Sequence, residues 1–149
     1  MENIVVATNR KAFHEYHILE EFEAGIQLRG SEVKSIREGK ASLKQSYILI
    51  RRGEAWLRGA HIASYSHTGY EGHEPVRDRK LLLHKKEIYK INSKLAEKGL
   101  TAVPIKLYFK GGFIKLEFGL AKGKKLYDKR DTKKKQDVQR DIQRAMRRG

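Results

Sequence analysis

Residues 121–130 carry the clearest chemistry in this sequence. Their lysines and arginine suit phosphate groups, their glycine lets a ligand approach the backbone closely, and their tyrosine ring can stack on a base. The residues that we predict to make such contacts are Lys122, Gly123, Lys124, Lys125, Tyr127, Asp128, Lys129 and Arg130. A solvated basic linker would have a similar charge, but the glycine and the tyrosine within the run favour a nucleic-acid-binding segment.

The same end of the chain carries most of the charge. Residues 119–149 contain twelve Lys or Arg and four Asp, so their net charge of +8 is more than half of the formal +15. With few apolar side chains, this segment cannot offset the entropy lost on ordering, and we expect it to be disordered when free. A nucleic acid matches this charge density best, although an anionic membrane surface would also satisfy the charge alone.

The apolar residues of this basic tail follow a helical spacing. Val138, Ile142 and Met146 are four residues apart, so they would form one thin stripe on a helix over residues 132–147. Isolated helices of about 12–15 residues are marginal in water, and this one is barely longer. We therefore predict that the tail, residues 121–149, becomes helical only when it is bound.

A second basic cluster lies near the N-terminus, where Asn9, Arg10, Lys11 and His14 follow one another closely. The cations suit phosphates, and the amide of Asn9 could bind a sugar or a base edge. A turn residue is an equally good interpretation of Asn9.

Two carboxylates, Glu23 and Glu32, stand out in so basic a chain. Paired carboxylates can serve as general acid and base. Their sequence surroundings offer no partnered nucleophile, metal set or pocket. A carboxylate can also accept hydrogen bonds from guanine or from ribose hydroxyls, or orient a neighbouring lysine. We predict that the protein is not an enzyme.

The sequence gives little support for a metal or a cofactor. It has no cysteine, and its six histidines follow no metal-binding spacing. On a strand, His14 and His17 would face opposite sides. We predict no metal site and no cofactor, and we interpret the histidines as structural or RNA-facing.

Composition predicts one small domain with an appendage. The chain has 149 residues, of which 39% are hydrophobic, enough for a single core within the first 120 positions. No apolar run approaches the roughly 18 residues of a membrane span, and the first residues lack the pattern of a signal peptide. We expect a soluble, cytoplasmic protein.

Periodicity predicts short strands and two helices. Strands are expected over 15–29, 46–50, 55–62, 103–109 and 113–120, with a hairpin turn at Gly111 and Gly112 and an exposed loop over 64–75. A short helix should begin near Ser31 and end at Gly39. A long helix should begin after Asp78 and end at 98–99, with an apolar stripe of Leu81, Ile88, Ile91 and Leu95.

In that long helix Leu82 and Leu83 fall off the stripe. At least one could be exposed and pack on a base, or the barrel could cover both. The expected fold class is mainly β with helices, an OB-like barrel over residues 1–120 followed by the tail.

Several separate strings together make the sequence similar to the small protein B family, the SsrA-RNA-binding proteins of bacteria. These strings are Asn-Arg-Lys-Ala at 9–12, His-Glu-Tyr at 14–16, Phe-Glu-Ala-Gly-Ile at 22–26, Gly-Ser-Glu-Val-Lys-Ser at 30–35, Arg-Lys-Leu-Leu-Leu-His at 79–84, and the whole of 121–130. The match runs from Asn9 to Arg130. Beyond Asp131 the tail is similar only in character, because 133–136 lacks the glutamate and the aromatic that are common in the family.

The resemblance implies an OB-like barrel that binds the tRNA-like part of transfer-messenger RNA (tmRNA, or SsrA RNA). It implies that the tail enters the decoding centre of a stalled ribosome and runs down the empty mRNA channel, so that tagging can begin without codon–anticodon pairing. The implied partners are tmRNA and small-subunit ribosomal RNA, with alanyl-tRNA synthetase and elongation factor Tu reached indirectly through tmRNA. We expect a monomer that does not bind membranes.

Carried over to this chain, the resemblance implies that Asn9, Glu23 and Leu83 engage the RNA. The full set of predicted tmRNA contacts adds Arg10, Lys11, His14, Lys34, Lys80, Leu82 and His84. The predicted contacts in the mRNA channel are Lys133, Lys134, Lys135, Arg140, Arg144 and Arg147. The alternatives are a ribosomal or ribosome-assembly protein whose basic tail threads ribosomal RNA, and a nuclease or RNA-modifying enzyme.

Overall fold

The computed structural model describes residues 4–64, 73–97 and 99–123. Within them it contains three helices, α1 (Lys11–Glu15), α2 (Gly30–Arg37) and α3 (Lys85–Leu95). The strands are β1 (Ile4–Thr8), β2 (Tyr16–Ile26), β3 (Ala41–Ser42), β4 (Tyr47–Arg51), β5 (Glu54–Arg58), β6 (His61–Ile62), β7 (Arg79–Leu82), β8 (Leu100–Lys110) and β9 (Phe113–Gly123). The predicted class, mainly β with helices, is confirmed.

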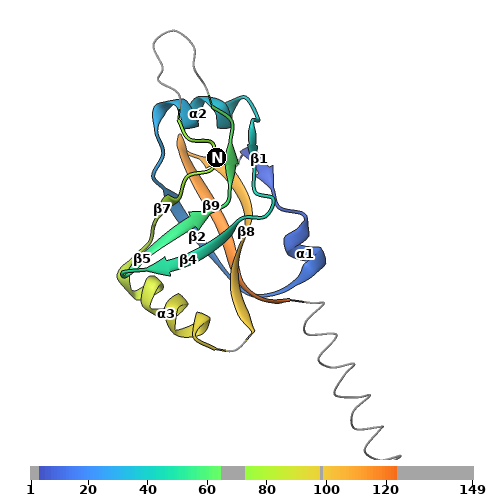
Figure 1. Cartoon of the computed structure of the whole chain (residues 1–149), viewed down its shortest axis with the longest axis vertical. Coiled ribbons are helices and arrows are strands. Elements are labelled where there is room, and N and C mark those ends of the chain that lie inside the picture. The colour runs from blue at the N-terminus through green and yellow to red at the C-terminus, as the bar shows by residue number, and fades with distance from the viewer. Residues whose placement is uncertain (1–3, 65–72, 98, 124–149) are drawn as a thin grey trace, which may run out of the picture.

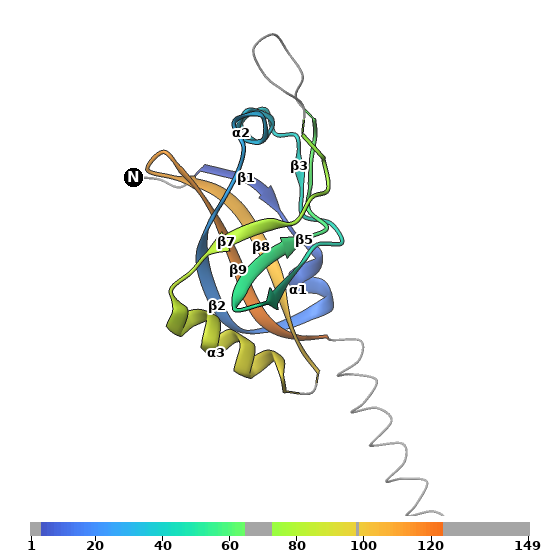
Figure 2. The same cartoon turned by 60° about the vertical axis from the view of Figure 1, so that its left-hand side comes forward.

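The main sheet closes on itself. Its antiparallel strands follow the order β1-β8-β4-β5-β7-β2-β9, and β9 also pairs with β8. In the described part of the chain six strands thus form a closed ring, with β1 added along β8 and a separate β3–β6 pair beside it (Figures 1 and 2). Alternate side chains point into the ring, and Leu57, Leu81, Leu107 and Phe118 are almost completely buried there.

Long pairings between distant parts of the sequence hold this ring together. The eleven-residue strands β8 and β9 form one hairpin, whose turn residues Gly111 and Gly112 both have positive φ, as predicted. β2 pairs with β9 along most of its length, from Tyr16 opposite Gly123 to Gly25 opposite Lys115. β7 joins β2 to β5 and so completes the circle.

Two helices lie at opposite ends of the ring (Figures 1 and 2). α2 buries Ser35 and Ile36, and the chain leaves it through Gly39 at φ 74°, as predicted. α3 buries Ile91, with Leu95 packed against the core. None of the helices among the described residues is long and apolar enough to cross a bilayer.

The prediction of a long helix after Asp78 was wrong. Residues 79–82 form strand β7, and the helix begins at Lys85 with His84 at its N-cap. A run of basic residues and leucines is compatible with the periodicity of a helix or of a strand. Here pairing with the two neighbouring strands β2 and β5 makes it a strand. Arg79 and Leu81 point inward, whereas Lys80 and Leu82 point outward.

Other boundaries also differ from the predictions. β9 continues to Gly123 rather than ending at Leu120, and its added residue Ala121 is completely buried. His14 lies in the short helix α1, not on a strand with His17. The predicted loop lies partly outside the described residues, and His73 within it is buried rather than exposed. The strand predicted over 55–62 is divided at Gly59, which has φ 86°, into β5 of the main sheet and β6 of the β3–β6 pair. β1, α1 and β3 were not predicted.

Candidate nucleic-acid interface

A groove of about 600 Å³ lies between the α3 N-terminus and the outer face of the ring. β2 contributes Glu23 and Gly25, the β4–β5 turn contributes Gly53 and Glu54, and β9 contributes Lys115. The remaining residues follow one another along the chain: Lys80, Leu81, Leu82, Leu83, His84, Lys85, Glu87 and Ile88. Five of the ten predicted tmRNA contacts therefore line one groove: Glu23, Lys80, Leu82, Leu83 and His84.

The pairing of β7 with β2 sets the shape of the groove. Gly25 lies opposite Leu82, and a Cβ atom at Gly25 would stand only 3.3 Å from the Cβ of Leu82. The missing side chain lets Leu82 rest on the outer face of the sheet, where it stays 54% exposed. An exposed leucine beside basic side chains can pack on a base or a ribose.

The start of α3 forms a second wall. His84 is the N-cap, and the Glu87 carboxylate accepts a hydrogen bond from its backbone N–H at 3.3 Å. The first turn presents backbone N–H groups and the positive end of the helix dipole, and Lys85 adds a cation. This wall favours anionic ligands.

Glu23 is held as a charged acceptor at the rim of the groove. Its carboxylate accepts a hydrogen bond from the Tyr108 hydroxyl, and the Lys110 ammonium lies 3.2 Å from Oε1. The hydrogen bond from Tyr108, and then that from Lys110, lower the pKa of Glu23 below its ordinary value. Burial, followed by the hydrogen bond to Glu23, raises the pKa of Tyr108. Glu23 is therefore ionised at neutral pH and can accept hydrogen bonds but not donate a proton.

Charges of both signs surround the exposed leucine. Lys80 forms an ion pair with Glu54 at 3.1 Å, and Lys115 contributes to lowering the pKa of Glu23. The groove can thus offer cations to phosphates, a fixed carboxylate to base amino groups or ribose hydroxyls, and an apolar surface to a ring.

Asn9 lies elsewhere and is buried. It follows β1, its side-chain Nδ2 donates to the Pro104 carbonyl at 2.9 Å, and its backbone N–H donates to the Ile105 carbonyl at 2.7 Å. These bonds fix the turn onto β8, which favours the interpretation of Asn9 as a turn residue. Its Oδ1 has no hydrogen-bond partner among the described residues. A direct RNA contact by Asn9 stays a prediction.

α1 packs against β2 and β8, away from α3 (Figures 1 and 2). Its N-cap Arg10 and its residues Lys11 and His14 are exposed. α1 leads directly into Tyr16, which pairs with Gly123 at the end of β9. This basic cluster therefore lies next to Gly123, the last residue of β9.

Lys34 lies on α2, and Lys122 and Gly123 end β9. The other predicted decoding-centre and mRNA-channel residues, from Lys124 onward, lie outside the described residues, and so does the predicted helix over 132–147.

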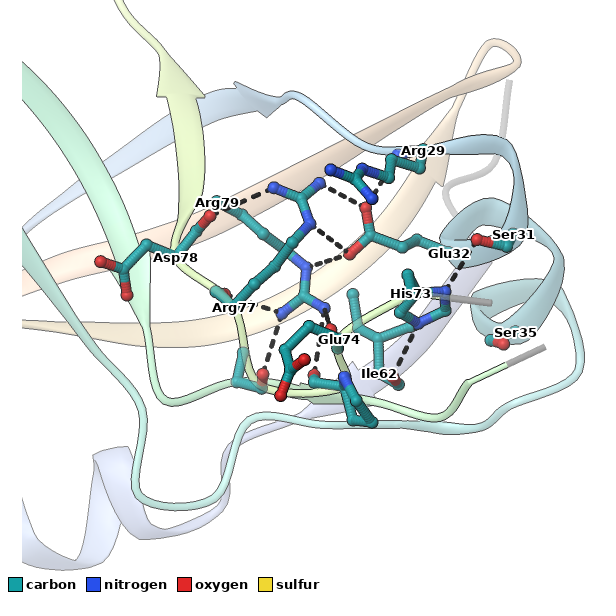
Figure 3. A network of polar contacts seen from close by, with 12 residues as sticks. Arg29, Ser31, Glu32, Ser35, Ile62, His73, Glu74, Arg77, Asp78 and Arg79 are labelled. Atoms are coloured by element: carbon teal, nitrogen blue, oxygen red, sulfur yellow. Dashed lines mark hydrogen bonds and ion pairs between the residues drawn. The ribbon is translucent and has the colours of Figure 1, made fainter. Parts of the chain in front are cut away.

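Glu32 and Glu23 do not share a site. Glu32 is completely buried on α2, where its carboxylate accepts hydrogen bonds from the side chains of Arg77 and Arg79 and from the backbone of Arg29 (Figure 3). Burial would raise the pKa of Glu32, but the hydrogen bonds from Arg77, Arg29 and Arg79 outweigh it and the pKa is lowered. Glu32 therefore anchors an ion-pair network rather than assisting Glu23 in acid–base chemistry.

Comparison with known proteins agrees with the resemblance found in the sequence. The family model described as SmpB protein matches residues 6–148. The chain belongs to the SmpB family. An SsrA-binding protein of Carboxydothermus hydrogenoformans is 55% identical over 143 residues, covering 96% of each chain. One of a Sulfurihydrogenibium species is 56% identical over 145 residues, covering 97% of this chain and 95% of the relative.

Among solved structures, an SmpB-family chain from work described as "tmRNA-SmpB: a journey to the center of the bacterial ribosome" superposes with a TM-score of 0.67. It is 47% identical, and the match covers 78% of this chain and 82% of the other.

Sequence reasoning missed several residues around the groove of this SmpB-family chain. Lys115, Glu54 and Gly53 line it, and Tyr108 and Lys110 hold Glu23. Tyr108 and Glu23 are 85 residues apart in sequence, so no local pattern connects them. The basic and apolar first turn of α3 is the one signal that was present, but the misplaced helix start obscured it.

Proposed function

We propose that this protein is a tmRNA-binding adaptor in trans-translation, with its groove binding the tRNA-like domain of tmRNA. The observation that carries the proposal is that Glu23 of β2 and four predicted contacts from one distant stretch of chain, residues 80–84, meet in one groove that combines cations, a fixed carboxylate and an exposed leucine. Membership of a family whose relatives are named SsrA-binding proteins supports the choice of RNA.

The adaptor would deliver tmRNA to stalled ribosomes, with its tail in the empty decoding centre and mRNA channel in place of codon–anticodon pairing. The position of Gly123 supports this division of labour: it pairs with Tyr16, next to α1, whereas the groove residues Gly25 and Lys115 lie near the other end of the β2–β9 pairing. Small-subunit ribosomal RNA would be the second partner. Alanyl-tRNA synthetase and elongation factor Tu would be reached through tmRNA, by a monomer without catalytic activity.

We also propose that the ring is an OB-like barrel. Its closed antiparallel pairing and the groove on its outer face support this, because such barrels present grooves to oligonucleotides.

A filter-binding titration tests the proposed function. The purified full-length protein should bind tmRNA more tightly than bulk tRNA at two salt concentrations, with both affinities falling as salt rises. A ribosomal or assembly protein, the alternative, would show no preference for tmRNA and would stay on ribosomes through washing. Equal affinity for the two RNAs would therefore refute the proposal.

Glu23→Gln should weaken tmRNA binding by about tenfold, because a charged acceptor is replaced by a weaker neutral one. The fold should tolerate the change, since Glu23 is exposed and Gln still accepts from Tyr108. Glu38→Gln is the matched control, because Glu38 is an exposed carboxylate paired with Lys40 outside the groove. The affinity of this variant for tmRNA should equal that of the wild type. If both variants bind as the wild type does, Glu23 is not an RNA contact.

Leu82→Ala should weaken tmRNA binding severalfold while changing the free energy of unfolding by less than about 1 kcal/mol, because the side chain is 54% exposed. Its neighbour Leu81 provides the contrast. Leu81 is 1% exposed, so Leu81→Ala should cost about 2–5 kcal/mol of folding free energy. Urea denaturation and RNA titration of both variants check this; unchanged RNA affinity in Leu82→Ala would mean that the leucine stays outside the RNA contact.

A further inference from the structure

The turn of the β4–β5 hairpin carries a second hollow, next to the groove but outside the predicted contacts. Its volume is about 310 Å³, and its lining residues are Arg51, Arg52, Glu54 and Trp56. Glu54 lines the groove as well, so the two hollows adjoin at this side chain. A strand of RNA lying in the groove can therefore continue into the hollow.

The pairing of three strands builds an aromatic and basic surface here. Trp56 lies between Leu49 of β4 and Lys80 of β7, all on the outward face. The Arg51 guanidinium lies 5.5 Å from the centre of the Trp56 ring, a cation–π distance. Stacked aromatic and guanidinium planes are the usual platform for a nucleic-acid base.

The indole of Trp56 has an unused hydrogen-bond donor. Its Nε1 is buried and has no partner within the part of the chain that the structure describes. Buried N–H groups are normally paired, so an unpaired one marks a place where an acceptor is expected. A base carbonyl or a phosphate oxygen of a nucleotide in the hollow would supply that acceptor. The side chain of Arg51, at the ring face, is 51% exposed and held by a long, 3.9 Å ion pair to Asp78, so it can move aside for the base.

Arg52 occupies a position that the turn does not favour for arginine. It has φ 54° and is followed by Gly53 at 73°, between the paired residues Arg51 and Glu54. Two-residue hairpin turns with positive φ prefer Asn-Gly, because an ordinary side chain is strained there. Arg52 is exposed, and within residues 4–64, 73–97 and 99–123 no acidic side chain pairs with it. Its guanidinium is thus available to a phosphate.

We propose that this hollow is a nucleotide-binding site that extends the groove: a base takes the place of Arg51 against the Trp56 ring, the indole N–H donates to the nucleotide, and Arg52 binds the adjoining phosphate. The inference rests on the proposed function, because the nucleotide belongs to the same bound tmRNA. The two hollows meet at Glu54, and the exposed guanidinium of Arg52, which pairs with no acidic side chain of the described residues, fits a phosphate, so RNA is favoured over an acidic protein.

Two substitutions separate binding from folding. Arg52→Asn should raise the midpoint of urea unfolding, because Asn suits the turn, and should weaken tmRNA binding about fivefold to tenfold. The slope of log affinity against log salt should also fall by about one, as expected for one lost phosphate contact. Trp56→Phe removes an unpaired N–H but keeps a ring, so it should weaken binding severalfold without loss of stability. Arg52→Lys keeps the charge and should bind within about threefold of the wild type.

A direct signal of occupancy comes from Trp56, which is the single tryptophan of the chain. Titrating full-length protein with the tRNA-like domain RNA should quench its fluorescence with the same midpoint as filter binding. If Arg52→Asn and Trp56→Phe both bind within twofold of the wild type and the emission does not change, the site is refuted. If these variants bind tmRNA with normal affinity but fail in tagging on ribosomes, the nucleotide site is also refuted, and the hairpin would instead contact a protein partner.

Failure of the second site can be distinguished from failure of the proposed function. If the wild type shows no preference for tmRNA, the proposed function itself fails. If the wild type binds tmRNA and Glu23→Gln weakens binding while the hairpin variants do not, only the second site fails.

Discussion

Removing residues 124–149 should abolish the tagging of stalled translation products and, at roughly 0.2 M salt, leave affinity for free tmRNA within about threefold of the wild type. The expected effect is large because the cut removes 26 residues with most of the basic tail, and the proposed adaptor needs that tail inside the ribosome. The groove and the ring stay complete, since β9 ends at Gly123. An in vitro tagging assay and a filter-binding titration measure the two effects.

The position of the cut decides whether the experiment separates the role of the tail from the stability of the ring. A cut after Gly119 would remove four residues of β9, including Leu120 and Ala121, which are 2% and 0% exposed and pair with β2 and β8. That shorter protein should lose both folding stability and RNA binding. If the protein ending at Gly123 keeps full tagging activity, the proposed role of the tail is wrong. If it loses RNA binding while remaining folded, the proposed division between groove and tail is wrong.

Glu32→Ala should lower the free energy of unfolding by about 3–5 kcal/mol, enough to unfold a marginal domain. Glu32 and Arg79 are both completely buried, and the substitution leaves the Arg79 guanidinium without its countercharge (Figure 3). The backbone carbonyls of Ala60 and Pro75, which Arg79 also binds, cannot neutralise it. Urea denaturation followed by circular dichroism measures the loss.

Glu97→Ala is the matched control for this change. Glu97, just beyond the end of α3, pairs with Lys94 at 3.5 Å; both side chains are exposed, and the loss of Glu97 should cost less than about 0.5 kcal/mol. A cost for Glu32→Ala as small as that of the control would mean that the buried network does not hold α2 to the ring.

The pH dependence of stability gives an independent check. The pKa of Glu32 is lower in the folded protein than its ordinary value of 4.5, so the unfolded state takes up a proton first as the pH falls. Its contribution is fully present above pH 4.5 and disappears as the pH falls through the folded pKa. The wild type should therefore lose stability over this acidic range more steeply than a Glu32→Gln variant, which has no proton to gain at this position.

Local patterns predicted those parts of the fold that depend on local chemistry. Gly111 and Gly112 marked the β8–β9 turn, and Gly39 marked the end of α2, because each needs a positive φ. β7 could not be recognised in this way. Its four residues acquire strand structure from β2 and β5, which are remote in sequence, and nothing in Lys80 or Leu82 alone excludes a helix.

The sequence predicted about as much of the groove as it did of the fold: the residues within one stretch of chain, but not those that the closure of the ring brings to them. Lys80, Leu82, Leu83 and His84 were identified because Leu82 and Leu83 fall off the predicted apolar stripe and basic side chains lie next to them. Lys115 and Tyr108 were missed, since only the closure of the ring brings β8 and β9 beside Glu23. Glu23 was singled out as a carboxylate in a basic chain, but the resemblance to a family supplied its expected contact with RNA, which its sequence neighbours do not indicate.

Closure by the last strand also governs how this chain can be made. β2 needs β9 along nearly its whole length, so a ribosome must synthesise residues up to 123 before the circle can be completed. Until then the edge of β2 has no partner, and the nascent chain is open to mispairing. Because these contacts join residues about a hundred positions apart, folding is expected to be slow compared with that of a helical bundle of equal size.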